Sequence, residues 1–69
     1  SIARLEVTYA AELSTLVTEE RRQLLIALEA VTDPECWGRM REFFGLSFEE
    51  ACAAWAQAID RLLPPTPPA

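Results

Sequence analysis

Two cysteines, two pairs of adjacent glutamates and two tryptophans are the side chains of this sequence best suited to catalysis or ligand binding. Nucleophilic catalysis of the Ser-His or Cys-His type needs an imidazole that activates the nucleophile. The chain contains no histidine, so neither pairing can form within it. We therefore predict that the protein is not an enzyme and that it carries no cofactor.

The cysteines, Cys36 and Cys52, lie 16 residues apart with no CxxC pair. A structural zinc site takes four ligands, so a second chain would have to supply the missing ones. A redox sensor requires an accessible thiolate, and only Arg39 and Arg41 stand near Cys36 to stabilise one. Both cysteines stand beside apolar residues on predicted helices, where free cysteine behaves as a small hydrophobic side chain. We expect that structural role and no metal site.

The charged residues have the arrangement that is typical of solvent-exposed helix surfaces. Glu19–Glu20 and Glu49–Glu50 stand at predicted helix starts, where the helix dipole favours carboxylates, so we assign them a structural role. The chain has six basic residues, all arginine, against eleven acidic ones, and its net charge is −5. It therefore has few cations for neutralising phosphates, which argues against direct contact with nucleic acid.

The distribution of apolar residues argues against a membrane protein. No apolar run approaches the ~20 residues that a membrane-spanning helix needs. The sequence shows no secretory signal segment, and two cysteines without one are typical of a reducing compartment. We expect a soluble, cytoplasmic protein that makes no membrane contact.

Apolar spacing predicts the helices that would carry these side chains. The first helix covers 2–17, with one stripe spaced 3, 4, 4 and 3 residues apart: Ile2, Leu5, Tyr9, Leu13 and Leu16. Its periodicity begins at once, without an initiator Met or a capping signal. This beginning indicates a segment cut from within a helix.

A second helix is predicted over 18–31. Thr18, followed by two glutamates, has the residue type of an N-cap. The alternative is one continuous helix, because Val17 and Leu24 would stay near the face of the first stripe. The segment from Leu24 to Val31 is apolar almost all round, so we expect burial on more than one side.

Start and stop signals define a third helix over 34–44. Asp33 accepts hydrogen bonds from free backbone N–H groups, and Pro34 fits the first helical position. Gly45 supplies the left-handed conformation that commonly ends a helix. One face of this helix is predicted to carry Trp37, Met40, Arg41 and Phe44.

The last helix is predicted over 48–63. Residues 47–50, SFEE, match the capping box that begins a helix. Its apolar stripe includes Ala51, Trp55, Ala58, Ile59 and Leu62. Residues 64–69, PPTPPA, cannot continue a helix and are predicted to be a Pro-rich disordered tail, with binding to a proline-reading domain as the alternative.

These elements predict an all-α fold, a small bundle of three to four helices in one domain over 1–63. A domain this short buries only about 60% of the surface that its unfolded chain exposes. We therefore expect a second protein surface, through dimerisation or a partner helix, to complete the bundle.

The run from Leu25 to Leu63 resembles the C-terminal helices of TetR-like transcriptional regulators. The resemblance rests on PECWGRMREFFGLSFEEA and the following AWAQAIDRLL, and covers somewhat over half of the chain. In that family the C-terminal domain binds small-molecule effectors and forms the homodimer, commonly through a four-helix bundle. The resemblance implies that the helix over 48–63 is a dimer helix whose contact stripe is Ala51, Trp55, Ala58, Ile59 and Leu62. The DNA-binding helix-turn-helix of the family is absent from these 69 residues.

The leading hypothesis is accordingly a dimerisation portion of a TetR-like repressor with a role in ligand sensing. A small-molecule effector would contact Trp37, Met40 and Tyr9, although aromatic residues on helix stripes more often belong to the core. The alternative is a free-standing helical adaptor for protein–protein interaction, which docks a partner helix.

Overall fold

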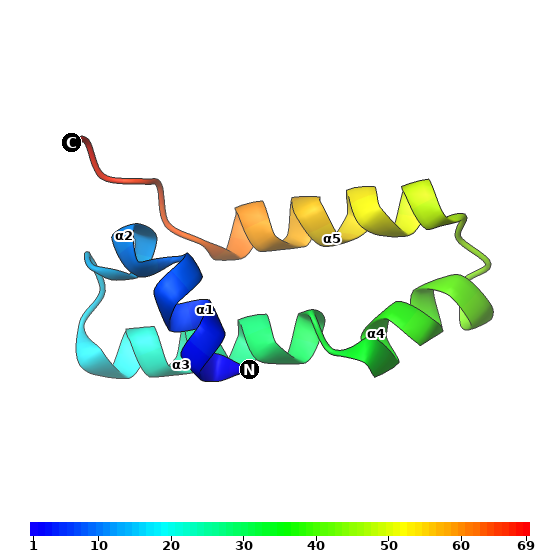
Figure 1. Cartoon of the computed structure of the whole chain (residues 1–69), viewed down its shortest axis with the longest axis horizontal. Helices are drawn as coiled ribbons and strands as arrows, with labels where there is room; N and C mark the ends of the chain where they lie inside the picture. The colour runs from blue at the N-terminus through cyan, green and yellow to red at the C-terminus, as the bar shows by residue number, and fades with distance from the viewer.

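The computed structural model describes residues 1–69 and consists of helices joined by short turns, without a strand. Two arms lie side by side along its long axis (Figure 1). One arm is formed by α3 (Thr18–Val31), α4 (Pro34–Gly38) and the π-helical turn η1 (Arg39–Phe43). The other arm is α5 (Phe48–Leu62), which returns in the opposite direction. The predicted all-α fold is confirmed.

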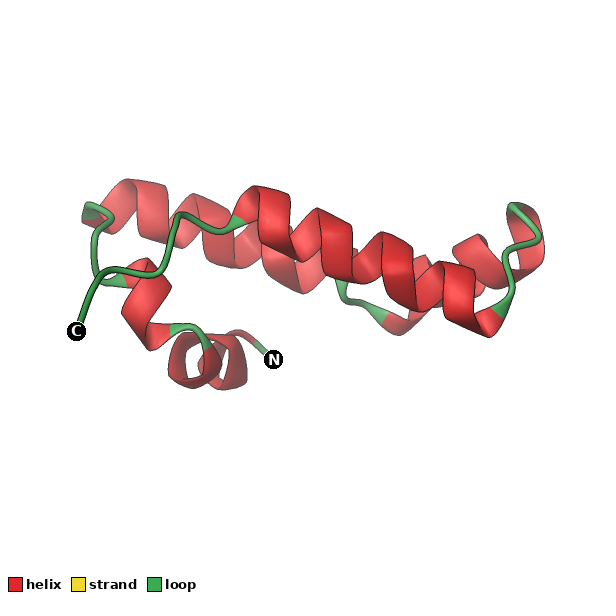
Figure 2. Cartoon of the chain, turned by 90° about the horizontal axis from the view of Figure 1, so that it is seen from above, coloured by secondary structure: helices red, strands yellow, loops and turns green.

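The N-terminal helices form a corner on the first arm, away from η1 (Figure 1). They are α1 (Ile2–Thr8) and α2 (Ala10–Leu13). α1 packs across α3 and is seen nearly end on in Figure 2. The guanidinium of Arg21 in α3 donates a hydrogen bond to the Glu6 carboxylate of α1 at 3.3 Å. This ion pair links the two helices at a half-buried position.

The predicted single helix over 2–17 is wrong. The backbone leaves the helical region at Tyr9, with φ −112° and ψ 28°, and the second piece ends at Leu13. The hydroxyl of Thr8 donates to the carbonyl of Arg4 at 2.9 Å, an interaction that bends helices because it competes with the backbone N–H. The spacing of apolar residues carries no information on this competition between a side-chain hydroxyl and a backbone N–H.

Two expectations about helix starts are also corrected. Ser1 accepts a hydrogen bond from the backbone N–H of Arg4 at 3.3 Å, so the first helix does have a side-chain cap. α3 begins at Thr18, which rules out one continuous helix, but Val17 in extended conformation occupies the N-cap position. No side chain caps α3, because the hydroxyl-bearing residue lies one position too late.

α3 is covered around only part of its circumference. Leu25 and Leu28 are buried, whereas Ile26 is 46% exposed and Ala30 is exposed. α1 and α5 pack against α3 and leave the side of these two residues to solvent. α3 therefore carries apolar residues on all of its sides, but a single chain buries only some of those sides.

The predicted helix over 34–44 is present as α4 and η1. Its start is capped as predicted, since the Asp33 carboxylate accepts a hydrogen bond from the backbone N–H of Glu35 at 2.7 Å. Its last turn is a π-helix, in which the N–H of Phe44 bonds to the carbonyl of Arg39, five residues earlier, at 3.0 Å.

The π-helical turn changes which way Phe44 faces. A π-turn contains more residues than an α-turn, so side chains beyond it lose the α-helical register. Phe44 is 64% exposed, while Trp37 and Met40 are half-buried. The prediction that Phe44 shares their face is wrong for this reason.

The turn between the arms is held by several hydrogen bonds. Gly45 has φ +68°, the predicted left-handed conformation. The backbone N–H of Leu46 bonds to the carbonyl of Met40 at 3.0 Å, and Arg41 Nε bonds to the carbonyl of Leu46 at 3.0 Å. The backbone of this turn is therefore tied to η1 from both directions.

α5 begins with the predicted capping box. The Ser47 hydroxyl accepts from the N–H of Glu50 at 3.1 Å, and the Glu50 carboxylate accepts from the N–H of Ser47 at 2.9 Å. α5 ends at Leu62, and residues 64–69 follow without helix and continue past α2 at the same end of the molecule (Figure 1).

The core of the chain is small. Four residues are buried and all are apolar: Leu13, Leu25, Leu28 and Ala51. Three of them come from α2 and α3, and the fourth comes from the first turn of α5. The structure thus has a leucine core at the corner and a single buried position near the turn.

The two glycines should respond in opposite directions to alanine. Gly45→Ala is expected to destabilise the fold by about 1–2 kcal/mol, because a Cβ is disfavoured at positive φ even where the surrounding space is open. Gly38→Ala is expected to stabilise it by about 0.5–1 kcal/mol, because Gly38 is helical and its Cβ would meet no atom within 4 Å. Urea unfolding followed by circular dichroism measures both; equal effects would contradict the left-handed turn.

The capping box should make stability depend on pH in the acid range. Hydrogen bonds from the backbone N–H and then the side chain of Ser47 hold the pKa of Glu50 below its ordinary value of 4.5. The folded state therefore binds this proton less readily than the unfolded state, so the stabilisation is present above pH 4.5 and is lost as the pH falls through the lowered pKa.

We expect Glu50→Gln to reduce the fall in melting temperature between pH 6 and pH 3. Glu49→Gln is the matched control, since it removes a carboxylate from the same helical turn that makes no side-chain hydrogen bond. Thermal melts across this pH range measure the difference, and identical profiles for the two variants would argue against the box.

Candidate functional site

The apolar stripe of α5, predicted as the dimer contact, faces the other arm of the same chain. Ala51 is fully buried, and Trp55, Ala58 and Ile59 are half-buried within the single chain. Leu62 remains 37% exposed at the end of the helix. α5 packs against α3 and η1, so the hairpin itself covers most of the stripe.

The three residues predicted to line an effector pocket are not brought together. Trp37 and Met40 belong to the α4–η1 segment near the turn. Tyr9 lies between α1 and α2, in the corner at the far part of the molecule (Figure 1). Sequence reasoning placed each residue on an apolar face but had no information on the distance between the faces.

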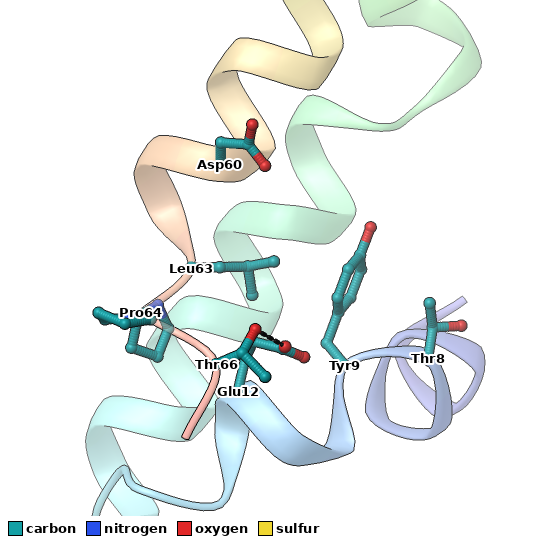
Figure 3. Close-up of a pocket in the computed structure, with 8 residues that line it drawn as sticks. Thr8, Tyr9, Glu12, Asp60, Leu63, Pro64 and Thr66 are labelled. Carbon is teal, nitrogen blue, oxygen red and sulfur yellow. Dashed lines mark hydrogen bonds between the residues drawn. The ribbon is translucent and has the colours of Figure 1, made fainter. Parts of the chain in front are cut away.

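Tyr9 instead borders an open hollow of about 530 Å³ between the corner, the end of α5 and the tail (Figure 3). The Thr66 hydroxyl donates a hydrogen bond to the Glu12 carboxylate and holds the tail over it. The hollow is lined by Thr8, Tyr9, Glu12, Asp60, Leu63, Pro64, Pro65 and Thr66. Two carboxylates and two threonines make it polar, and of the three residues predicted to contact an effector only Tyr9 lines it.

Near the turn, aromatic side chains join the two arms. The rings of Trp37 in α4 and Trp55 in α5 have centroids 5.0 Å apart and an interplanar angle of 48°. Trp37 also meets Phe48 edge to face, at 5.4 Å and 75°. Such pairs contribute about 0.5–1.5 kcal/mol beyond the area they bury. This cluster joins α4 to α5.

Three phenylalanines flank the turn with most of their surface in solvent. Phe43, Phe44 and Phe48 are 71%, 64% and 61% exposed. Phe43 and Phe44 pack against each other edge to face, with centroids 4.9 Å apart. We name these three residues the aromatic turn surface. Sequence reasoning missed it, although three phenylalanines within six residues around a predicted turn were a visible signal.

The arginines near this surface already have partners. The guanidinium carbon of Arg39 lies 5.0 Å from the centroid of the Phe43 ring, within the range of a cation–π contact. Arg41 lies 6.0 Å from the centre of Trp37 and donates to the carbonyl of Leu46. Their charges therefore stabilise the aromatic groups and the turn.

The reactive side chains are scattered. Cys36 is half-buried, Cys52 is exposed, and both are free thiols. No three side chains of the types His, Cys, Asp or Glu converge on a position where a metal ion would sit. The one carboxyl with a shifted pKa, Glu50, owes the shift to its helix cap. What the structure does leave exposed is a set of large apolar side chains.

No family model, curated protein or solved structure matches this chain. None of its helices combines the length and the apolar character required to cross a lipid bilayer.

The tryptophan contact should carry a large part of the stability. We expect Trp55→Ala to destabilise the fold by about 3 kcal/mol, because it removes the ring that α4 packs against. Trp55→Phe should cost clearly less, since it keeps a ring and removes an indole N–H that is buried without a hydrogen-bond partner. Urea unfolding followed by circular dichroism compares the two, and equal losses would contradict the central place of the ring.

Proposed function

We propose that this chain is a dimerisation region, and that it serves as the C-terminal, effector-sensing part of a TetR-like transcriptional regulator. The observation that carries the dimerisation is the amount of surface left exposed. The chain has an accessible surface of 5091 Å², whereas a compact monomer of 7.7 kDa is expected to expose about 4,300 Å². The excess, about 800 Å², matches what one partner contributes to an interface of standard size.

Part of the exposed surface is also apolar, as a surface that binds another protein requires. Only four of 69 residues are buried. The large apolar side chains left exposed are Ile2, Val7, Val17, Ile26, Phe43, Phe44, Phe48 and Leu62. Association with a second protein surface would bury part of this area and extend a core that one chain cannot complete.

The assignment to a TetR-like regulator rests on the sequence resemblance from Leu25 to Leu63. The acidic net charge of −5 supports a part of the regulator that does not contact DNA itself. An effector would enter the polar hollow beside Tyr9, at the junction of the corner with α5. Effector binding would act by favouring one arrangement of the dimer.

One observation favours the second candidate, a helical adaptor. Between α1 and α3 lies an open groove of about 420 Å³. Three apolar residues line it, Ile2, Leu25 and Ile26, together with Glu6, Thr18, Arg21 and Arg22. A partner helix with an apolar face would fit this groove.

The two functions predict different behaviour of the purified chain. A dimerisation region should sediment at twice 7.7 kDa at micromolar concentration and dissociate on dilution. If the chain stays a folded monomer throughout the concentration range, the proposed dimerisation is wrong and the adaptor remains as the candidate function. Sedimentation equilibrium makes the measurement, with circular dichroism to show that the chain is helical.

The regulator assignment has a separate test in the coding sequence that precedes this segment. We expect it to encode a helix-turn-helix with a basic recognition helix. A dimer preceded by any other type of domain would retain the dimerisation and overturn the TetR-like assignment.

A further inference from the structure

We propose that residues 63–68, LPPTPP, form a docking segment for a partner protein whose groove is lined by aromatic side chains and binds polyproline II helices. We name these residues the proline segment. The inference goes beyond the proposed function and does not rest on it, because the prolines lie outside the helices and outside the run that resembles TetR-like regulators.

The backbone of the proline segment is held close to polyproline II geometry before any partner arrives. Four of its six residues are proline, and each ring fixes φ at about −65°. Leu63 and Thr66 each precede a proline, which disfavours the helical region for them as well. Leu63 has φ −75° and ψ 140°, close to the values of a polyproline II helix. Binding would therefore order few backbone angles that were free beforehand, which limits its entropic cost.

The prolines form two pairs, and one pair faces solvent. A polyproline II helix has three residues per turn, so residues three apart lie on the same edge, about 9 Å from each other. Pro65 and Pro68 form one pair, and both are exposed. Pro64 and Pro67 form the other, and both are half-buried. The exposed pair has the spacing of a PxxP ligand, so a partner can make its first contact there.

The carbonyl groups of the proline segment determine which kind of groove fits. Residues 64–69 take part in no backbone hydrogen bond, and proline has no N–H that could pair with a neighbouring carbonyl. A partner must therefore supply hydrogen-bond donors as well as apolar surface. Tryptophan and tyrosine offer both, since the ring packs on proline while the indole N–H or phenolic O–H donates to a carbonyl.

A charged residue beside the proline segment gives the docking a direction. Arg61 is exposed in the last turn of α5 and belongs to none of the three ion pairs of the chain. Its neighbour Asp60 lines the hollow beside Tyr9, whereas Arg61 does not. A carboxylate at one end of the partner groove would pair with this guanidinium. The pair would select one of the two directions in which a proline helix can lie in a groove.

One hydrogen bond holds the proline segment to the corner of the molecule. The Thr66 hydroxyl donates to the Glu12 carboxylate at an exposed position (Figure 3). Residues 64–69 make no other hydrogen bond to the chain. An exposed hydrogen bond contributes little net stability, because water replaces it when it breaks. A groove that encloses the segment would therefore displace this contact at small cost.

The test titrates the full chain into an isotope-labelled SH3 domain, chosen for carboxylates at one end of its aromatic groove, and follows chemical shifts by nuclear magnetic resonance. We expect saturable binding with shifts confined to the groove. Pro67→Ala together with Pro68→Ala removes one ring from each pair and should raise the dissociation constant at least about 10-fold. Pro34→Ala is the matched control, since it changes the one proline outside the segment and should leave the constant unchanged.

Further variants test the charge and the hydrogen bond. Arg61→Gln should raise the dissociation constant at least about 5-fold, whereas Arg4→Gln, which removes another exposed arginine outside the ion pairs, should not. Glu12→Ala should lower the constant roughly 2- to 10-fold, because it frees the segment from the corner. Glu42→Ala removes an exposed carboxylate from η1 and controls for net charge. Circular dichroism shows that each variant keeps its helices.

The outcomes separate this inference from the proposed dimerisation. An absence of binding at about 1 mM chain would overturn the inference and leave the dimerisation, which rests on other residues. Binding that survives the double proline change would also overturn it, since the groove would then contact another part of the chain. Equal losses from Arg4→Gln and Arg61→Gln would assign the effect to net charge and overturn the role of Arg61.

Discussion

The contact between Trp37 and Trp55 is the interaction on which the shape of this protein depends. α4 is followed by η1 and a short turn before α5 begins, and without a contact between the arms the turn alone would not set their distance. The two rings, 5.0 Å apart, hold the arms together, and Phe48 extends the contact toward the turn. The exposure of Phe44 has a different origin, the π-helical turn that follows α4.

The second constraint is the size of the chain. A hairpin of two helical arms and one corner encloses a few leucines, but it cannot place apolar side chains between two complete layers. Leu25 and Leu28 on one side of α3 are buried while Ile26 on another side is not. An exposed apolar surface is therefore a consequence of how much chain there is to cover it.

The turn combines a fixed backbone with exposed apolar side chains. Its polar groups are largely paired among themselves, since Arg41 bonds to Leu46 and Ser47 bonds to Glu50. The groups at the turn that are still available to a partner are the phenylalanine rings. This combination distinguishes the aromatic turn surface from the hollow at Tyr9, which presents carboxylates and threonines across a wide opening.

The sequence by itself determined the features that act over a few residues. The cap at Asp33, the left-handed Gly45 and the box of Ser47 could be predicted because each depends on hydrogen bonds or backbone angles within about four residues. The spacing of apolar residues predicted Tyr9 within a continuous helix, because that spacing carries no information on a hydroxyl that competes for a backbone carbonyl.

Only the tertiary structure decided which apolar faces are covered. The stripe of α5 meets its own chain, Tyr9 lies far from Trp37 and Met40, and the phenylalanines at the turn point to solvent. Periodicity identifies an apolar face, but what covers that face depends on contacts between segments distant in sequence.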